Sequence, residues 1–341
     1  MAFRSRTAQR GKAGRGDAAQ RLAESARFYA DADARGALFR APERPELLER
    51  RRRTLEGGAA LDVEWASTYE PIHPTYAARL AERSANRTAH ARWLRHAEVR
   101  PVLVCLHGWG GGLPAIEERA FVARWWYRKG MDVVLPALPF HGARAGSVLR
   151  RPSFPSTDPI VSNEGFAQAV HDLRALAAAL RARGAPAVVL TGMSLGGFTT
   201  TLAATVDTTF DAAIPMIPFA SLPRLLWDHG SGTPARERAK AQGIDLPTFE
   251  AAFAATSPLR RTPRLDPTRV LVLAADGDAV TPPHHAAEIR DHFSNDVARA
   301  QLVAFAGAHL LQVGRGDAFR AMARFLGGHG WLPSRKTAKG A

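Results

Sequence analysis

Short apolar runs alternate with longer amphipathic segments along the chain from residue 98 to residue 328. The apolar runs have little internal alternation, which is typical of parallel strands buried on both faces. The segments between them have helical spacing and end near glycines such as Gly130 and Gly184. This order predicts a doubly wound, mostly parallel sheet of the α/β class. We expect strands over 99–106, 132–135, 187–190, 212–217, 269–274 and 301–305, and helices over 115–128, 164–183, 195–205, 284–293 and 317–326.

The first hundred residues follow a different pattern. Residues 1–20 are rich in Gly, Arg and Ala without an apolar period, which predicts a disordered basic N-terminus. Region 21–97 is expected to hold an N-terminal helical extension followed by edge strands. The last helix of the extension is expected over 45–55, with the four arginines at 50–53 near its C-terminal end. The strands are expected to be antiparallel and to cover 61–65 and 88–95.

The alternation of strands and helices is interrupted once, between residues 219 and 266. This segment of about fifty residues contains three short helical patterns and no strand-like run, so we expect a small helical insertion. It divides the α/β core into a first half over 98–218 and a second half over 267–328. A basic tail follows over 329–341.

One predicted strand-to-helix junction has the sequence Gly192-Met193-Ser194-Leu195-Gly196. Glycines stand two residues before and two residues after the serine, where a Cβ atom would collide with the opposing backbone of a tight bend. This G-x-S-x-G pattern predicts a nucleophile elbow, a sharp turn that leaves the hydroxyl group of Ser194 exposed.

Three other turns that follow predicted strands contain polar residues suited to the same chemistry. The first begins with His107 and continues with a glycine-rich loop around Trp109, which could turn backbone N–H groups toward a substrate oxygen. The second contains Asp276 and Asp278, and the third contains His309. Active sites of such sheets lie beyond the carboxyl ends of the strands, so these groups are expected to meet there.

The order serine, acid, histidine, with each residue after a strand, resembles the α/β-hydrolase superfamily over roughly residues 98–328. The resemblance implies a serine hydrolase that uses neither a metal ion nor an organic cofactor. Ser194 is the expected nucleophile and needs a base, for which we choose His309 because imidazole titrates near neutral pH. Asp278 is expected to hold the imidazole in the required tautomer.

The resemblance also assigns the groups that would surround the substrate. The backbone N–H groups of Trp109 and Leu195 are expected to form the oxyanion hole. The insertion over 219–266 is similar to the caps of this superfamily, and its Leu225 and Trp227, together with Trp109, are the candidate substrate-binding residues. Packing of the cap onto the core is the alternative role for the cap side chains.

Several residues compete for these roles. Asp276 is the alternative acid, although Asp278 lies four residues before Pro282, a spacing that resembles the acid turn of the superfamily. His309 is preferred as the base because it lies in a glycine-containing loop after the last strand. The other histidines in this part of the chain are His284, His285, His292 and His329.

Charge and composition limit the partners. The formal net charge is +14, but the arginines are scattered and no nucleic-acid-binding motif is visible, so no nucleic acid partner is expected. Peripheral contact with a membrane stays open, and Arg144, Arg150 and Arg151 are candidates to contact an anionic group. Cys105 is the single cysteine and is expected to be a small buried residue. No run of about eighteen apolar residues and no secretory signal is present, so a cytoplasmic location is expected.

These observations predict an enzyme that cleaves a small-molecule carboxylic ester or thioester through an acyl-enzyme intermediate. Acyl transfer to an acceptor other than water would use the same residues. A noncatalytic receptor or scaffold with the same fold is the alternative from another class, and the complete set Ser194, Asp278 and His309 argues against it.

Overall fold

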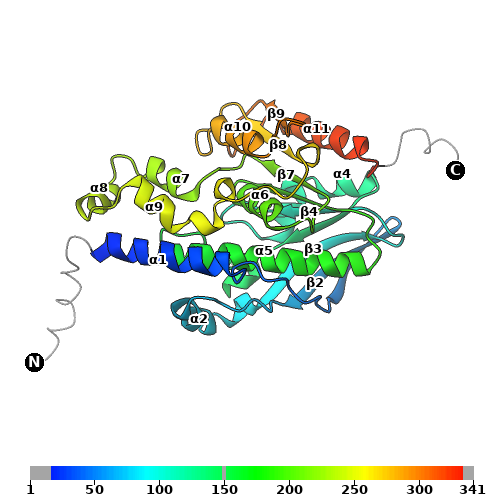
Figure 1. Cartoon of the computed structure of the whole chain (residues 1–341). Helices are drawn as coiled ribbons and strands as arrows, with labels where there is room; N and C mark the ends of the chain where they lie inside the picture. Colours follow the sequence, from blue (N-terminus) through cyan, green and yellow to red (C-terminus); the bar gives the residue numbers. More distant parts are fainter. Residues whose placement is uncertain (1–16, 148–150, 333–341) are drawn as a thin grey trace, which may run out of the picture.

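The computed structural model describes residues 17–147 and 151–332 and contains one nine-stranded sheet with helices on both faces (Figure 1). The strands are β1 (Leu48–Leu55), β2 (Gly58–Ala66), β3 (Thr88–His96), β4 (Val102–Leu106), β5 (Asp132–Pro136), β6 (Val188–Met193), β7 (Ala212–Met216), β8 (Leu271–Ala275) and β9 (Gln301–Phe305). Their order is β1-β2-β3-β5-β4-β6-β7-β8-β9. Strands β4 to β9 run parallel to one another. Strands β1, β2 and β3 pair antiparallel and form one edge of the sheet beside β5. The predicted mostly parallel α/β sheet is confirmed.

The helices pack in two layers against this sheet. The α-helices are α1 (Asp17–Ala34), α2 (Pro74–Ala81), α3 (Pro114–Ala120), α4 (Ala123–Arg128), α5 (Pro159–Ala182), α6 (Leu195–Val206), α7 (Leu222–His229), α8 (Pro234–Ala241), α9 (Leu246–Ala252), α10 (Pro283–His292) and α11 (Arg315–Gly328). Short 3₁₀ turns cover Ser84–Arg87, Gly142–Ala145, Ala254–Thr256, Pro258–Arg260 and Pro267–Arg269. Helices α1, α5 and α6 share one apolar cluster, and α4 and α11 share another on the opposite face.

Strand β4 shows why the central strands are apolar along their whole length. Its five residues are all buried. Val102, Val104 and Leu106 enter the cluster beneath α5 and α6, while Leu103 and Cys105 enter the cluster beneath α4 and α11. Because successive side chains of a strand point to opposite faces, a strand covered on both sides needs apolar residues at every position.

A chain of phenylalanine rings fills the layer between α5, α6 and the segment after β7. Phe166 on α5 lies 4.8 Å from Phe154 and 4.6 Å from Phe198, measured between ring centroids. Phe198 on α6 in turn stacks on Phe219 at 4.6 Å. These four rings are buried and join α5 to the helix that begins after Ser194.

The prediction of a helix over 45–55 is wrong, because this segment contains strand β1. The strand pairs with β2 across the turn Glu56-Gly57, where Gly57 has a φ of +70°. Pairing with β2 overrides the local helical spacing, and glycine in a two-residue connection is the hairpin signal in the sequence that marks it. Most of the strand's side chains are exposed, and Arg52 and Arg53 pair with Asp62 and Glu118. Arginines on an edge strand also oppose pairing with another sheet.

The largest differences from the predicted helix bounds occur at two helices, each for a local reason. The helix expected over 115–128 is divided into α3 and α4 by Val122, whose φ of +45° lies outside the helical region. Helix α5 begins five residues earlier than expected, at Pro159. Asp158 caps it by accepting a hydrogen bond from the backbone N–H of Ile160, and proline at the first helical position is favourable because it needs no N–H partner there.

The described N-terminal part of the chain and the insertion are both helical. Residues 17–20, expected to be disordered, form the first turn of α1, whereas 1–16 and 333–341 lie outside the described residues. The segment 219–266 contains α7, α8 and α9. Figure 1 shows these helices grouped near the start of α1, and α9 packs beside α1 through the apolar cluster.

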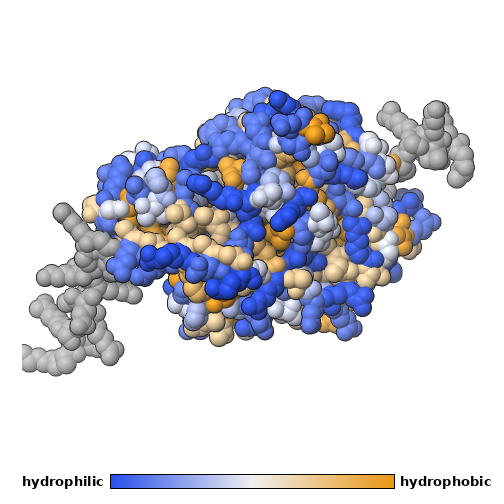
Figure 2. Space-filling model, in the orientation of Figure 1, coloured by the Kyte–Doolittle hydropathy of each residue, from blue (hydrophilic) through white to orange (hydrophobic). Residues whose placement is uncertain are grey.

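The described surface carries charged groups over a wide area. Figure 2 shows hydrophilic residues over much of one face, with pale hydrophobic bands and a few strongly hydrophobic patches between them. Many arginines are paired, and Arg92, for example, contacts both Asp62 and Glu118. No helix in the two described ranges is long and apolar enough to span a bilayer.

Replacing Phe166 by alanine tests the aromatic chain. Phe166→Ala should lower the free energy of unfolding by about 3–5 kcal/mol, since it leaves a cavity between two buried rings. Urea unfolding followed by circular dichroism measures this change. The control Val297→Ala removes a side chain that is 95% exposed and should change the free energy of unfolding by less than about 0.5 kcal/mol. Equal effects of the two substitutions would contradict this account of the packing.

Candidate active site

The turn between β6 and α6 places Ser194 in a conformation that few side chains adopt, with φ of +54° and ψ of −111°. Two glycines permit this turn. A Cβ on Gly192 would lie 2.4 Å from the carbonyl carbon of Gly196, and one on Gly196 would lie 2.1 Å from the carbonyl oxygen of Leu106. The Ser194 side chain makes no capping hydrogen bond to α6. The residue therefore stands at the turn without serving as a helix cap.

Asp278 and His309 lie together at the ends of β8 and β9. Nδ1 of His309 donates a hydrogen bond to Oδ2 of Asp278 at 2.8 Å. Oδ1 of Asp278 accepts hydrogen bonds from the backbone N–H groups of Val280 and Thr281, both at 2.8 Å. The Asp278 side chain is fully buried and that of His309 is 13% exposed. This arrangement fixes the imidazole ring by a buried and fully hydrogen-bonded carboxylate.

The pKa of Asp278 lies below its ordinary value. Burial alone would raise this pKa, but the hydrogen bonds from His309 and Thr281 and the charge of a protonated His309 outweigh it. The carboxylate is therefore ionised at neutral pH, and it stabilises positive charge on the imidazole.

The competing residues are placed elsewhere. Asp276 is exposed, and its backbone N–H donates to the carbonyl of Phe305. His284 is exposed on α10, while the adjacent His285 is buried and accepts the backbone N–H of Ala220. His292 and His329 each bond a backbone carbonyl group.

The glycine-rich loop after β4 lies beside the serine. A Cβ on Gly108 would lie 3.7 Å from the Cβ of Ser194. Behind the loop, Nδ1 of His107 donates to the carbonyl oxygen of Gly108 at 2.7 Å, and Nε2 accepts the backbone N–H of Leu138 at 3.0 Å. Burial, and then the nearby His141, lower the pKa of His107 to about 3. His107 is therefore a neutral support of the loop.

Glu117 supports the other end of this loop, and nothing in the motif pointed to it. Its Oε1 accepts the backbone N–H of Gly112 at 2.9 Å, and the side chain is buried on α3. Burial raises the pKa of Glu117, although the hydrogen bonds from Gly112 and Leu113 act in the opposite direction.

Thr281 is a second residue that the motifs did not reveal. Its hydroxyl group lies 2.9 Å from Oδ2 of Asp278 and 3.2 Å from Nδ1 of His309.

Ser194 and His309 both line one cleft of about 1000 Å³. Leu195 also lines it and begins α6, so its N–H has no acceptor within the helix. Trp109 lies at the cleft with 48% of its surface exposed. The other apolar residues that line the cleft include Ile116, Met193, Ile217, Phe219, Leu222, Leu225, Leu226, Val280 and Leu310.

The remaining candidates for substrate contact separate into two groups. Leu225 lines the cleft, but Trp227 on the same helix does not. The Trp227 ring packs against Phe249 and under the guanidinium group of Arg236. Arg151 also lines the cleft, with its guanidinium group 5.0 Å from the centroid of Trp109.

The expectation that Arg144 contacts an anionic ligand is wrong. Its side chain is buried in an ion pair with Asp172. Arg150 lies outside the described residues. Within the parts of the chain that the structure describes, no group of three or more His, Cys, Asp or Glu side chains could hold a metal ion.

The comparisons with known proteins agree with this fold. A family model described as alpha/beta hydrolase domain containing 18 matches residues 46–224, which is more than half of the chain. The model of the prolyl oligopeptidase family matches residues 163–329. Two proteins of Mycobacterium tuberculosis, uncharacterized protein Rv2627c and uncharacterized protein MT2702, are each 36% identical to this chain over 148 residues. The match covers 43% of this chain and only 36% of the length of each relative.

Solved structures show the same architecture at low identity. An acetyl xylan esterase from Paenibacillus sp. R4 has a TM-score of 0.61 and 17% identity, covering 88% of this chain and 94% of that chain. Acetyl xylan esterase 1 from Thermoanaerobacterium sp. JW/SL YS485 has a TM-score of 0.55 and 16% identity, covering 90% of this chain and 97% of that chain. At such identities the likeness establishes the fold alone.

The buried histidine beside the site gives a pH-dependent prediction. Burial, then the neighbouring charges of His284 and Arg224, lower the pKa of His285 to about 4 in the folded protein, whereas the unfolded value is about 6.5. Below that value the unfolded chain binds a proton that the folded chain does not, so this residue makes the folded state less stable as pH falls from about 6.5 to about 4.

The effect is isolated by comparing wild type with His285→Asn, which keeps an acceptor for Ala220. The free energy of unfolding of wild type, relative to the variant, should fall by up to about 1.4 kcal/mol per pH unit in this window. Urea unfolding at half-unit pH steps measures it. A difference that does not change between pH 6.5 and 4.5 would contradict the neutral state of His285.

Proposed function

Since this chain belongs to the alpha/beta hydrolase domain containing 18 family of α/β-hydrolases, we propose that it is a serine hydrolase that cleaves a carboxylic ester or thioester. One observation carries the proposal. His309 is bonded to the buried Asp278 and lines the same cleft as Ser194, which stands on the strained turn. A nucleophile, a base and a group that orients the base are thus gathered at one edge of the sheet.

In the proposed reaction, the hydroxyl group of Ser194 attacks the acyl carbon while Nε2 of His309 takes up its proton. Nδ1 of His309 is already committed to Asp278, so Nε2 is the ring atom left to accept a proton. The carboxylate of Asp278 stabilises the resulting imidazolium. His309 then gives the proton to the departing alcohol or thiol, which leaves an acyl-enzyme on Ser194. Water attacks the acyl-enzyme in the second half of the reaction, with His309 again as the base.

The negative oxygen of the tetrahedral intermediate is proposed to bind the N–H groups of Trp109 and Leu195. The location of Leu195 at the first position of α6 supports this role, because the N-terminus of a helix favours negative charge. The loop of Trp109 approaches Ser194 from the other side through Gly108. Each such donor contributes a factor on the order of 100 or more to the rate.

The lining of the cleft favours an acyl substrate with an apolar part. Most of the side chains around Ser194 are aliphatic or aromatic, from β4–α3, β6–α6 and α7. Two of the structural neighbours are named acetyl xylan esterases, which act on esters, and this is consistent with ester cleavage here. Acyl transfer to another acceptor would use the same groups. A receptor without turnover would bind its ligand without needing Ser194 as a nucleophile.

Labelling with a fluorophosphonate probe tests the assignments. Wild type should be labelled, and Ser194→Ala should abolish the label because the nucleophile is gone. His309→Ala and Asp278→Asn should slow labelling by factors on the order of 1000 or more, since both lower the basicity available to the serine. Asp276→Asn is the matched control and should be labelled at the wild-type rate. Measurement of gel fluorescence against time gives each rate.

The opposite results have clear meanings. Folded wild type that is neither labelled nor active on p-nitrophenyl esters would overturn the proposed function in favour of the receptor. Loss of labelling in Asp276→Asn with retention in Asp278→Asn would overturn the assignment of the acid.

The role of the insertion is tested by chain length. Leu225→Trp should narrow the cleft and lower kcat/KM for p-nitrophenyl octanoate by a factor on the order of 10 relative to the acetate. Trp227→Leu is the control on the same helix, and it should leave the ratio of the two values unchanged because Trp227 does not line the cleft. A changed ratio in the control alone would show that the substrate contacts were assigned to the wrong face of α7.

A further inference from the structure

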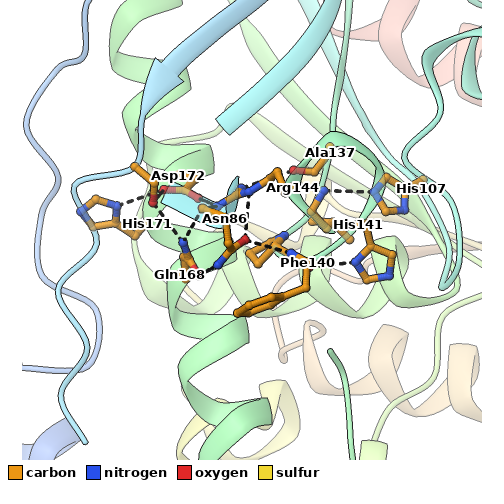
Figure 3. Close-up of polar contacts among 12 residues, drawn as sticks. Asn86, His107, Ala137, Phe140, His141, Arg144, Gln168, His171 and Asp172 are labelled. Carbon is orange, nitrogen blue, oxygen red and sulfur yellow. Dashed lines mark hydrogen bonds and ion pairs between the residues drawn. The ribbon is translucent and has the colours of Figure 1, made fainter. Parts of the chain in front are cut away.

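A buried ion pair joins the loop after β5 to α5 and has no role in the proposed reaction. Arg144 and Asp172 are 1% and 5% exposed in their side chains, and Nη2 of Arg144 lies 2.7 Å from Oδ2 of Asp172 (Figure 3). Removing both charges from water opposes folding, so a buried pair is weak support for stability by itself.

Arg144 connects three segments that are far apart in the sequence. Its Nη2 also donates to the backbone carbonyl of Asn86 at 2.9 Å, and Nη1 donates to the carbonyl of Ala137 at 3.4 Å. The side-chain oxygen of Asn86 accepts the backbone N–H of Phe140 at 2.9 Å. The planar guanidinium group thus fixes the loop after β5 to the segment before β3 and, through Asp172, to α5.

The loop held by Arg144 is in contact with the glycine-rich loop after β4. A Cβ on Gly142 would lie 2.2 Å from the carbonyl oxygen of Gly112, so the two backbones touch. The rings of His107 and His141 lie with their centroids 4.9 Å apart. Leu138 in the same loop donates its N–H to Nε2 of His107. Any displacement of the loop after β5 therefore reaches His107.

His107 transmits that position to one peptide group. Because Nε2 accepts the N–H of Leu138, the proton of the neutral ring is on Nδ1, and Nδ1 donates to the carbonyl oxygen of Gly108. The carbonyl of Gly108 and the N–H of Trp109 belong to the same peptide group. In a trans peptide the C=O and N–H bonds point in opposite directions. Holding the oxygen of Gly108 toward His107 therefore turns the N–H of Trp109 away from it.

We propose that Arg144, held by Asp172 and Asn86, is a positioning residue for the oxyanion-hole peptide between Gly108 and Trp109. The inference rests on the proposed function, since it concerns the same site. Arg144 acts through the loop after β5 and through His107, without touching the substrate. The segment before β3 and helix α5 thereby help to orient the N–H group of Trp109.

Two variants test the proposal. Arg144→Lys keeps a positive charge beside Asp172 but cannot contact three groups at once. Arg144→Met combined with Asp172→Leu replaces the pair by apolar side chains, an exchange that commonly leaves stability unchanged or higher. The matched control is Tyr69→Phe, which breaks a buried hydrogen bond to Glu164 on α5, the helix that also carries Asp172.

In both test variants kcat should fall by a factor on the order of 10 to 100 with KM within about twofold of wild type, since a mispositioned group acts on the transition state. Affinity for a boronic acid, which forms a tetrahedral adduct on serine, should fall in parallel. The control should keep both values within about twofold of wild type.

Hydrogen exchange of the backbone amides in residues 107–113 supplies a readout that needs no activity. Exchange there should accelerate at least about tenfold in the test variants and stay unchanged in Tyr69→Phe, with thermal unfolding measured in parallel. Unchanged exchange in folded test variants would overturn the positioning role whether or not the protein is a hydrolase. Equal loss of activity in the control and the test variants at equal stability would overturn it as well. Inactive and unlabelled wild type would instead overturn the proposed function.

Discussion

The close passage of α6 over β4 is the constraint on which the arrangement of the site depends. A Cβ on Gly196 would lie 2.1 Å from the carbonyl oxygen of Leu106, so the first turn of the helix rests directly on the backbone of the neighbouring strand. That contact brings the end of β4, and the glycine-rich loop that follows it, beside Ser194. The positive-φ conformation of Ser194 has a cost on the order of 1–3 kcal/mol. The hydrogen bond from its N–H to the carbonyl of Met216 helps to hold it.

Parallel strands explain why groups from distant parts of the sequence meet at this point. The strands β4, β6, β8 and β9 all end at the same edge of the sheet, and each is followed by one of the groups around the cleft. The insertion between β7 and β8 does not disturb this alignment of strand ends, because the chain exits the core after β7 and returns to it at the adjacent strand β8. A chain of this topology can therefore lengthen one connection, here with α7 to α9, without separating Asp278 and His309 from Ser194.

Sequence patterns predicted those parts of the molecule that depend on local rules. Gly192 and Gly196 indicate a tight turn whose backbone leaves no room for a side chain. Buried strands such as β4 are recognisable in the sequence by continuous apolar residues. Strand β1 is not predictable from its pattern because its side chains are mostly exposed, so it lacks the apolar–polar alternation of a half-buried strand and the local helical spacing dominates. Arg144 was misplaced because a buried ion pair leaves no periodic signal, and its partners are 28 and 58 residues away.

Two histidines on the same edge of the sheet show how surroundings decide what one residue type can do. Both nitrogens of His107 are used by backbone groups, and burial lowers its pKa to about 3, so it cannot exchange a proton near neutral pH. His309 instead has a carboxylate on one nitrogen, lies at the cleft and is 13% exposed. The first is suited to fix a backbone dipole, and the second to carry charge in the proposed reaction.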